Sequence, residues 1–432
     1  MTATASRRGT TPRVGGVAAE LAEAARPFVG GELPVRLRVW DGSEAGPADA
    51  PVVELVRPDA LRRLLWHPGE LGAAQAYVTG ELDVPGDLGA ALTHASAVGR
   101  ERGLPLGRPS PAAFGRGLRT LRSLGVLGRP LPPPASQARV RGRLHSRLRD
   151  RRAISHHYDL SNEFYALILD PAMAYSCAYY GDDPEQTVES AQRAKLDLVC
   201  RKLDLGPDRS LLDVGCGWGS LSLHAAEHFG ARVVGVTISA EQKRLIDQRI
   251  AGRGLDDRVE IRLQDYRDVP ERDHFDSVGS LEMGEHVGER TYPTYVDVLA
   301  RVVRPGGRVL VQQMSRTGRH PGGGPFIESF IAPDMHMRPV GETVALLERG
   351  GLEVRDVQSL REHYVRTVAG WLENFELNLS ELTALVGEEV VRVWRLYLVG
   401  GALAFRDGRM GVDQILCVRP GADHDLPPER AW

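Results

Sequence analysis

A glycine-rich segment at Leu211–Ser220 (LLDVGCGWGS) has the residue types that most directly suggest a ligand site. A strand-like apolar stretch runs into the glycines, and a helical pattern follows them. Glycine permits a tight turn and the close approach of a ligand, and the amides of a helix N-terminus favour polar or anionic groups. By itself, however, the segment also fits a glycine turn without a function.

Two further strand ends make the ligand site more specific. The stretch VVGVTIS ends a second strand near Thr237 and is followed by Gln242. A third strand ends at Gln264, just before Asp265 and Tyr266. In open α/β sheets, ligands bind at the carboxyl ends of the strands. Three such strand ends in this order indicate a ligand site far more strongly than the glycine turn alone.

The elements that would position these residues alternate between strand and helix from about Arg151 to the C-terminus. The strand-like stretches are LLDVGCGWG, ARVVGVTIS, VEIRLQD, FDSVGSLEM and GRVLVQQMS, with helical segments between them. This alternation is typical of a doubly wound sheet, so we expect an α/β, Rossmann-like domain over residues 151–432. Residues 315–339 interrupt the pattern with Gly and Pro and are expected to cover the substrate site.

The first third of the chain is predicted to hold a flexible N-terminus at residues 1–17 and a small α+β domain at residues 18–100. Residues 101–150 are rich in Pro, Gly and Arg, which predicts a linker. Residues 116–152 contain eleven arginines and a single acidic residue. This stretch is either a solvated linker or a surface for anionic lipid headgroups. Nucleic acid is disfavoured as a partner because no aromatic residues are interleaved for base stacking.

The composition is that of a globular protein of two domains. The chain has 432 residues, of which 42% are hydrophobic and 26% charged, with a net charge of −3. No apolar run reaches the roughly 20 residues that a membrane-spanning helix needs, and no secretion signal is present. The four cysteines lack metal-ligand spacing, which indicates reduced thiols in a cytoplasmic protein, and no structural metal is expected.

The glycine segment and the two strand ends resemble the motifs of class I S-adenosylmethionine-dependent methyltransferases, with GxGxG in place of the dinucleotide GxGxxG. The resemblance implies S-adenosylmethionine as the cofactor. It places Thr237 and Gln242 on the ribose side and Asp265 with Tyr266 at the adenine. The full set of implied cofactor residues is Tyr175, Ser176, Asp213, Gly215, Gly217, Trp218, Gly219, Thr237, Gln242, Asp265 and Tyr266.

Three longer motifs resemble the cyclopropane-fatty-acyl-phospholipid synthase family. They are HHYDLSNEFYALILDPAMAYSCAYY at residues 156–180, LEMGEHVGERTYPTYVDVLARVVRPGG at 281–307 and AFRDG at 404–408. The resemblance continues more weakly through the N-terminal domain, which in that family assists lipid engagement. It implies alkylation of double bonds in the acyl chains of membrane phospholipids. It also implies a cytoplasmic enzyme bound peripherally to the inner face of the membrane, and leaves open a homodimer.

The chemistry sets further requirements. A cis alkene is a poor nucleophile, so it must be held against the sulfonium methyl group in a dry apolar slot. Methyl transfer leaves a carbocation, which aromatic faces stabilise and a base must deprotonate. The resemblance implies a bound bicarbonate as this base, held by Cys177, Glu285 and Tyr364, with His286 beside them. Each of these also fits a structural role: a buried small thiol, helix-capping residues and a core tyrosine.

Gln312 stands where cyclopropane synthases carry a histidine, and it is the fifth candidate catalytic residue. Glutamine can hydrogen-bond an anion but cannot carry a proton at neutral pH. The carbocation either closes a cyclopropane or, after a hydride shift, loses a proton to give an exocyclic methylene. The actinobacterial branch that resembles tuberculostearic-acid methyltransferases also carries glutamine there. We therefore favour a 10-methylene product, later reduced by a separate reductase, over a cyclopropane.

Two other functions stay open. An enzyme of this fold could methylate a soluble small molecule, which a pocket closed to acyl chains would favour. A lipid-binding protein without catalysis is the second, and the intact glycine motif argues against it. A nucleic-acid methyltransferase is disfavoured because the sequence has no NPPY-type motif to hold a flipped base.

Overall fold

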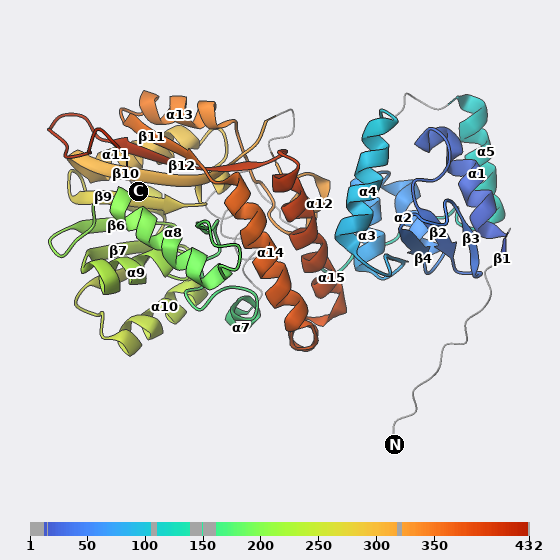
Figure 1. Cartoon of the computed structure of the whole chain (residues 1–432), viewed down its shortest axis with the longest axis horizontal. Helices are drawn as coiled ribbons and strands as arrows, with labels where there is room; N and C mark the ends of the chain where they lie inside the picture. The colour runs from blue at the N-terminus through green and yellow to red at the C-terminus, as the bar shows by residue number, and fades with distance from the viewer. Residues whose placement is uncertain are drawn as a thin grey trace, which may run out of the picture. The chain divides into compact units, whose positions relative to one another are not determined.

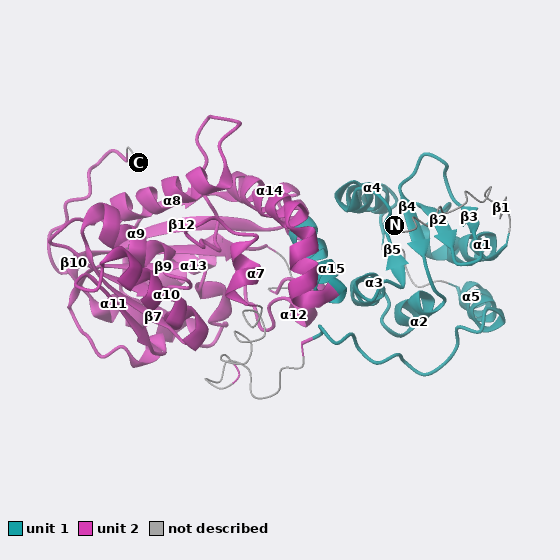
Figure 2. Ribbon diagram, turned by 90° about the horizontal axis from the view of Figure 1, so that it is seen from below, with its two compact units in different colours: residues 1–137, 388–400 teal, residues 138–387, 401–432 magenta. Residues whose placement is uncertain are grey.

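The chain forms two compact units, one of residues 1–137 and 388–400 and one of residues 138–387 and 401–432 (Figure 2). The structure is a computed structural model. It describes residues 13–14, 16–104, 110–138, 149, 161–317 and 322–430.

The first unit is built around a five-stranded sheet of order β1-β3-β2-β4-β5. Its strands are β1 (Arg13–Val14), β2 (Arg36–Val39), β3 (Ser43–Ala45), β4 (Val52–Leu55) and β5 (Leu82–Asp83). Its helices are α1 (Val17–Val29), α2 (Asp59–Trp66), α3 (Glu70–Val78), α4 (Leu88–Glu101) and α5 (Pro111–Ser123). Leu21 of α1, Val39 of β2 and Leu55 of β4 pack in its core. Helix α5 falls within the predicted linker, yet it packs against α1 and so belongs to this unit.

Helix α15 (Leu379–Arg406) contributes residues to both units. Its residues 388–400 belong to the first unit, where Glu389 accepts hydrogen bonds from the amide and the hydroxyl of Ser136 at 2.7 and 2.6 Å. At Gly387 the helix departs from regular geometry with a φ of 82°, in the left-handed region that favours glycine. A segment from far along the sequence therefore completes the small unit, and no local pattern predicts this.

The second unit contains a seven-stranded sheet of order β11-β12-β10-β9-β6-β7-β8. Its strands are β6 (Ser210–Val214), β7 (Arg232–Thr237), β8 (Val259–Leu263), β9 (Phe275–Leu281), β10 (Val303–Ser315), β11 (Glu353–Ser359) and β12 (Gly411–Val418). Strands β6 to β10 pair in parallel, whereas β12 pairs antiparallel with β10 and with β11. This arrangement confirms the Rossmann-like α/β class expected from the strand–helix alternation.

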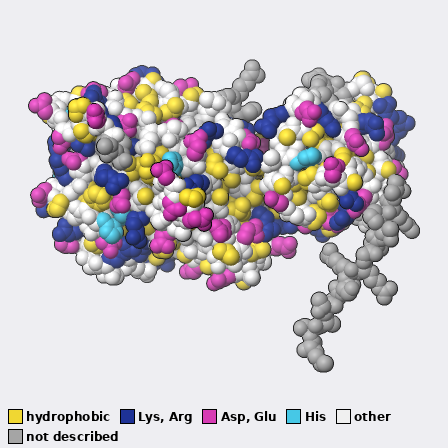
Figure 3. Space-filling view, in the orientation of Figure 1, with side chains coloured by type: hydrophobic (Ala, Val, Ile, Leu, Met, Phe, Trp, Pro, Cys, Tyr) yellow, Lys and Arg dark blue, Asp and Glu magenta, His cyan; other side chains and the backbone are white. Residues whose placement is uncertain are grey.

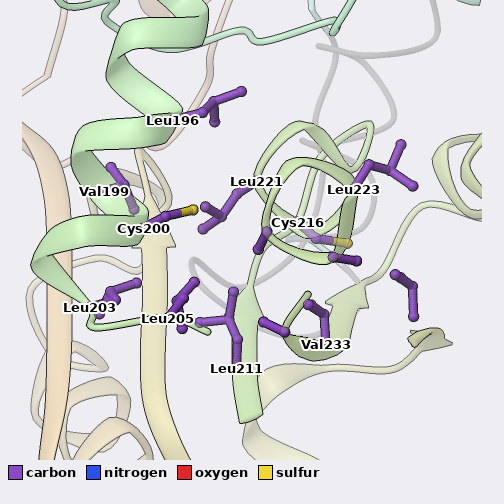
Figure 4. Close-up of a cluster of buried hydrophobic side chains, with 14 of the residues drawn as sticks. Leu196, Val199, Cys200, Leu203, Leu205, Leu211, Cys216, Leu221, Leu223 and Val233 are labelled. Carbon is purple, nitrogen blue, oxygen red and sulfur yellow. The ribbon is translucent and has the colours of Figure 1, made fainter. Parts of the chain in front are cut away.

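Helices cover both faces of this sheet (Figure 1). The described helices of this unit, besides α15, are α7 (Asn162–Ala166), α8 (Val188–Lys202), α9 (Ser220–Phe229), α10 (Ala240–Arg253), α11 (Tyr292–Val302), α12 (Pro325–Phe330), α13 (Val340–Arg349) and α14 (Arg361–Leu377), with 3-10 turns η1 (Tyr266–Asp268) and η2 (Gly284–His286). Successive side chains of a strand point to opposite faces. In β10, Leu310 therefore packs with α8 and α9, a cluster shown in Figure 4, while Val309 and Val311 pack with α11 and α13.

Basic and acidic side chains are interspersed over the face of the molecule drawn in Figure 3. Among the described helices, none is long and apolar enough to cross a membrane. The four cysteines are buried free thiols. Most of the arginine-rich stretch at residues 139–152 lies outside the described residues. Arg149 is described, and its guanidinium pairs with Asp334 at 2.8 Å.

Candidate active site

The glycine turn lies at the carboxyl end of β6 and leads into α9, at the sheet edge where β7, β8 and β9 also end. Gly215, Gly217 and Gly219 have φ angles of 80°, 55° and 81°, which favour glycine. A Cβ at Gly215 would lie 2.7 Å from Cγ of Met283, and one at Gly219 would lie 3.0 Å from Cγ2 of Ile246. Backbone conformation therefore favours glycine at all three positions, and limited space adds to this at Gly215 and Gly219.

Local hydrogen bonds hold the polar residues at the first two strand ends. The buried carboxylate of Asp213 accepts from the hydroxyl of Ser222 at 2.7 Å, and burial raises the pKa of Asp213 to about 6. The hydroxyl of Thr237 donates to Oε1 of Gln242 at 2.8 Å. These bonds orient side chains of β6 and β7 at the edge that the glycine turn occupies.

The third strand end carries Asp265 and Tyr266. The guanidinium of Arg267 forms an ion pair with Asp265 at 2.6 Å, and the ring of Tyr266 packs edge-on against that of Tyr295 with 5.7 Å between centroids. Both predicted adenine-side residues are therefore fixed in orientation.

A single pocket brings the predicted cofactor residues together at this edge of the sheet. Ten of them line it: Tyr175, Ser176, Asp213, Gly215, Gly217, Trp218, Thr237, Gln242, Asp265 and Tyr266. Gly219 does not, and it instead forms the N-cap of α9. Two residues capable of acid–base chemistry, Glu282 and His286, also line the pocket.

The pocket residues Tyr175 and Ser176 lie in a segment that two side chains of α8 hold in place. Gln192 Nε2 donates to the carbonyls of Ala174 and Ser176 at 3.1 and 2.8 Å, and Lys195 Nζ donates to the hydroxyl of Ser176 at 2.7 Å. Burial lowers the pKa of Lys195, and the negative charge of Glu282 opposes this effect. Lys195 thus sets a buried cationic group close to the pocket wall.

Aromatic rings gather beside the same wall. The ring centroid of Tyr175 lies 5.3 Å from Trp371 and 5.7 Å from Tyr165, and Tyr165 lies 4.5 Å from Trp218. The faces of such rings carry partial negative charge. Tyr175 and Trp218, which line the pocket, can therefore stabilise a positively charged group bound within it.

A second cluster is centred on Glu282, the residue directly after β9. Its Oε1 accepts hydrogen bonds from the amide of Cys177 at 2.7 Å and from Gln312 Nε2 at 2.8 Å. Its Oε2 accepts from the hydroxyl of Tyr364 at 2.6 Å. The φ of Glu282 is 52°, a strained value for a residue with a side chain, and such strain is concentrated at functional sites. Three predicted catalytic residues thus surround one carboxylate.

A buried lysine determines which way the Gln312 amide points. Lysine has only donors, and Lys202 Nζ donates to Oε1 of Gln414 at 2.9 Å and to Oε1 of Gln358 at 2.6 Å. The NH2 group of Gln414 must then point away from Lys202, and it donates to Oε1 of Gln312 at 2.9 Å. The NH2 group of Gln312 is consequently directed at Glu282.

Glu285 and His286, both predicted to be catalytic, lie in the turn η2. Within the described part of the chain, the Glu285 carboxylate is not bonded to any of the three residues that hold Glu282. Burial raises the pKa of Glu285 to about 8, and the charge of Glu282 adds to this effect, so Glu285 is mainly protonated at pH 7. Burial lowers the pKa of His286 to about 4, which leaves its imidazole neutral.

The ionisation of Glu282 reflects two opposing influences. Burial raises the pKa of Glu282, whereas the hydrogen bonds from Tyr364, Cys177 and Gln312 lower it. Burial, followed by the charge of Glu282, raises the pKa of the Cys177 thiol well above its ordinary range. Cys177 therefore contributes its backbone amide to the cluster, while its sulfur stays protonated.

Two residues of the site were not anticipated from the sequence. Glu282 could have been found by the rule that pointed to Asp265, because it also follows a buried strand directly at the ligand edge. The EHVG motif directs attention to Glu285 instead, three residues further on. Lys195 carries no local signal, since its burial depends on how α8 packs.

The glycine turn after β6, the antiparallel strand β12 and the pocket at the carboxyl edge define a class I S-adenosylmethionine-dependent methyltransferase.

Comparison with known proteins narrows this class. Residues 145–415 match the family described as mycolic acid cyclopropane synthetase. The chain is 39% identical to a probable fatty acid methyltransferase of Pseudomonas putida, over 91% of this chain and 95% of that protein. It is 36% identical to the tuberculostearic acid methyltransferase UfaA1 of Mycobacterium tuberculosis, over 90% of this chain and 88% of that protein. The crystal structure of mycolic acid cyclopropane synthase CmaA1 complexed with SAH and CTAB superposes with a TM-score of 0.59 at 32% identity, covering 62% of this chain and 98% of that one.

The chain belongs to the mycolic acid cyclopropane synthetase family. It is a methyltransferase that uses S-adenosylmethionine, in a family that transfers a methyl-derived carbon to unsaturated lipid chains. The family resemblance and the cofactor predicted from the sequence motifs are both confirmed.

Proposed function

We propose that this enzyme adds a methyl-derived carbon to the cis double bond of an unsaturated phospholipid acyl chain and forms a 10-methylene product. The similarity to the tuberculostearic acid methyltransferase UfaA1, at 36% identity over 90% of this chain, carries the proposal. Gln312 supports it, because the cyclopropane synthases carry histidine at that position. A separate reductase would then convert the methylene group into a methyl branch.

The pocket residues fit S-adenosylmethionine by shape and by charge. The left-handed glycines Gly215 and Gly217 leave their part of the pocket wall free of side chains, and the strand-end residues Thr237 and Asp265 present oriented polar groups. When bound, S-adenosylmethionine supplies an electrophilic methyl group on a positively charged sulfur. Tyr175 and Trp218 offer aromatic faces to positive charge on the sulfonium and on the acyl chain during the reaction.

The product is tested by proton NMR of the fatty acids from a host rich in oleoyl phospholipid that expresses this chain without a partner reductase. Vinylidene protons are expected. Upfield cyclopropane protons would instead show that the ring closes. Mass spectrometry cannot distinguish the two products, because both add one CH2 group. Unmodified lipid from cells whose purified enzyme still binds S-adenosylhomocysteine would favour a soluble small-molecule substrate. A host expressing a glycine-turn variant, Gly215→Val, is the matched control.

The small first unit supports a proposed peripheral contact with membrane lipid. Helix α5 exposes Phe114 and Leu118, with 58% and 42% of each side chain accessible, one helical turn apart on the same face. The exposed ring of Phe28 lies 3.8 Å from the Cβ position of Gly117, so the apolar strip continues onto α1. Exposed arginines flank the strip: Arg116, Arg119 and Arg122. An apolar face with basic flanks is typical of helices that lie in the interface of anionic membranes.

A further inference from the structure

Bicarbonate, the base that the family resemblance implies, does not fit the cluster around Glu282. Two groups expected to hold that anion, Cys177 and Tyr364, already donate to the two oxygens of Glu282 at 2.7 and 2.6 Å, and so does Gln312, which replaces the histidine of the cyclopropane synthases, at 2.8 Å. These three donors cannot hold a second anion while they hold this carboxylate. An added anion would also be repelled by the charge of Glu282.

We propose that Glu282 is itself the general base of the reaction, a catalytic carboxylate supplied by the chain where an external anion would otherwise bind. This inference rests on the proposed alkylation of an acyl double bond and identifies the group that removes the proton. The three hydrogen bonds and the place of Glu282 in the pocket wall carry it.

The bonding of Glu282 leaves room for one proton. The two oxygens of a carboxylate offer about four lone-pair sites. Two donors occupy Oε1 and one occupies Oε2, so Oε2 keeps a lone pair for a proton. Because Glu282 also lines the cofactor pocket, a substrate held there would lie beside this residue.

The surroundings of Glu282 favour a carboxylate that can accept a proton over one that is held permanently ionised by a cationic partner. Burial raises the pKa of Glu282, and its three hydrogen-bond donors are neutral groups. By contrast, Asp265 on the same pocket edge is paired with the guanidinium of Arg267. The charged and titratable groups facing Glu282 are Lys195 from α8, Glu285 from η2, the Cys177 thiol and the Tyr364 hydroxyl from α14. A general base works best when its pKa lies near the operating pH.

The chemical step balances without another reactant. The π electrons of the double bond form the new bond to the methyl carbon, and the bond between that carbon and sulfur breaks with its electron pair left on sulfur. The adjacent chain carbon becomes cationic, and a hydride shift moves the charge to the methylated carbon. Glu282 then removes a proton from the new methyl group, whose C–H pair becomes the exocyclic double bond. The protonated Glu282 later releases this proton to solvent.

The first test is Glu282→Gln, which keeps the size of the side chain and removes the base. We expect kcat for oleoyl phospholipid to fall by about 10²- to 10⁴-fold, the contribution typical of a general base. The affinity for S-adenosylhomocysteine, measured by calorimetry, should change less than about threefold. The same substitution at exposed Glu289, seven residues along the chain, is the matched control and should leave kcat unchanged. Retained activity in Glu282→Gln, or a loss of cofactor affinity that accounts for the loss of activity, would overturn the proposal.

The second test concerns bicarbonate and begins with the wild-type enzyme. The wild-type enzyme should have the same kcat in carbon-dioxide-free buffer and in buffer with added bicarbonate, whereas stimulation by bicarbonate would overturn the proposal. In Glu282→Ala the three donors are freed, so added bicarbonate or acetate should restore part of the lost activity in a concentration-dependent way. No restoration in a folded Glu282→Ala protein that binds S-adenosylhomocysteine would count against an anion site at this position. A wild-type enzyme that alkylates no phospholipid would refute the proposed function instead.

Discussion

The two ends of the pocket are built in different ways. The cofactor end consists largely of backbone turns and side chains at the carboxyl ends of β6, β7 and β8, three strands close together in the sequence. The carboxylate end depends on side chains from separate segments, with Glu282 after β9, Gln312 on β10 and Tyr364 on α14. The first end is therefore specified by local sequence, and the second by tertiary packing.

This difference has a functional meaning. Backbone turns bind a cofactor whose shape is the same for every member of the fold. Side-chain networks can be changed without disturbing the turns, so they suit the part of the reaction that differs among relatives. Variants at the two ends should consequently have separable effects, with cofactor affinity altered at one end and turnover at the other.

The largest effect on cofactor affinity is expected at the cofactor end, from Gly215→Val. The new side chain would occupy the space of Met283 Cγ and strain a backbone with φ of 80°, so Met283 must move into the pocket it lines. Affinity for S-adenosylhomocysteine should fall about a hundredfold, equivalent to about 3 kcal/mol. Gly254→Ala has the same left-handed backbone but open space around its Cβ, and calorimetry should show unaltered affinity. Equal losses in both variants would mean that strain alone, and not filling of the pocket, weakens binding.

A smaller loss is expected at the carboxylate end from Lys202→Met. The amide oxygens of Gln414 and Gln358 would lose a buried donor, which should lower the free energy of unfolding by about 2 kcal/mol in guanidinium titrations. Lys243→Met is the control, since its exposed i,i+4 ion pair with Asp247 contributes only about 0.5 kcal/mol. If Lys202→Met also lowered the affinity for S-adenosylhomocysteine, the two ends of the pocket would not be independent.

Tyr364→Phe should lower the turnover rate without lowering the affinity for the cofactor. Removing one hydrogen bond from the Glu282 carboxylate is expected to lower kcat about tenfold, or about 1.4 kcal/mol. The bond from Tyr364 lowers the pKa of Glu282, so its loss raises that pKa. A base must be ionised to act, and activity is lost as pH falls through its pKa. The acidic limb of the kcat profile should therefore move to higher pH, while an unmoved limb would indicate a packing role for Tyr364 alone.

The smallest effect is expected in the first unit, from the double variant Phe114→Ser and Leu118→Ser on α5. Sedimentation with vesicles containing anionic phospholipid should show binding weakened about fivefold, equivalent to about 1 kcal/mol, because part of the apolar strip is lost. Affinity for S-adenosylhomocysteine should stay the same. Leu377→Ser, which removes a side chain that is 76% exposed in the other unit, is the control. Equal vesicle binding by both proteins would place the membrane contact elsewhere.

The sequence predicts the larger unit well because its signals are local. The alternation of apolar strands with helices fixes the sheet class, and the strand ends at Asp213, Thr237 and Asp265 lead to one pocket. The carboxylate cluster was only partly predictable. Motif resemblance singled out Cys177 and Tyr364, and the strand-end rule could have pointed to Glu282, but the hydrogen bonds that join them form only when β9 and α14 are placed together.

The small unit shows the same limit of local patterns. Its strands and several helices follow alternating and amphipathic patterns, whereas α5 lies in a stretch whose Gly, Pro and Arg content indicates a linker. The contribution of residues 388–400 has no sequence signal, because Glu389 and Ser136 are 253 positions apart. Long-range hydrogen bonds of this kind can be recognised only in the folded structure.

A chain of hydrogen bonds runs from Lys202 through the side-chain amides of Gln414 and Gln312 to Glu282. Each group in it donates to the next one. Carboxamides at neutral pH neither lose nor gain protons. The two glutamine amides therefore orient Glu282 but do not transfer a proton from it into the protein interior. A proton taken up by Glu282 cannot escape through these amides. Because Glu282 also lines the pocket, a proton held on its carboxylate meets solvent when the pocket empties, so product departure would reset the active site.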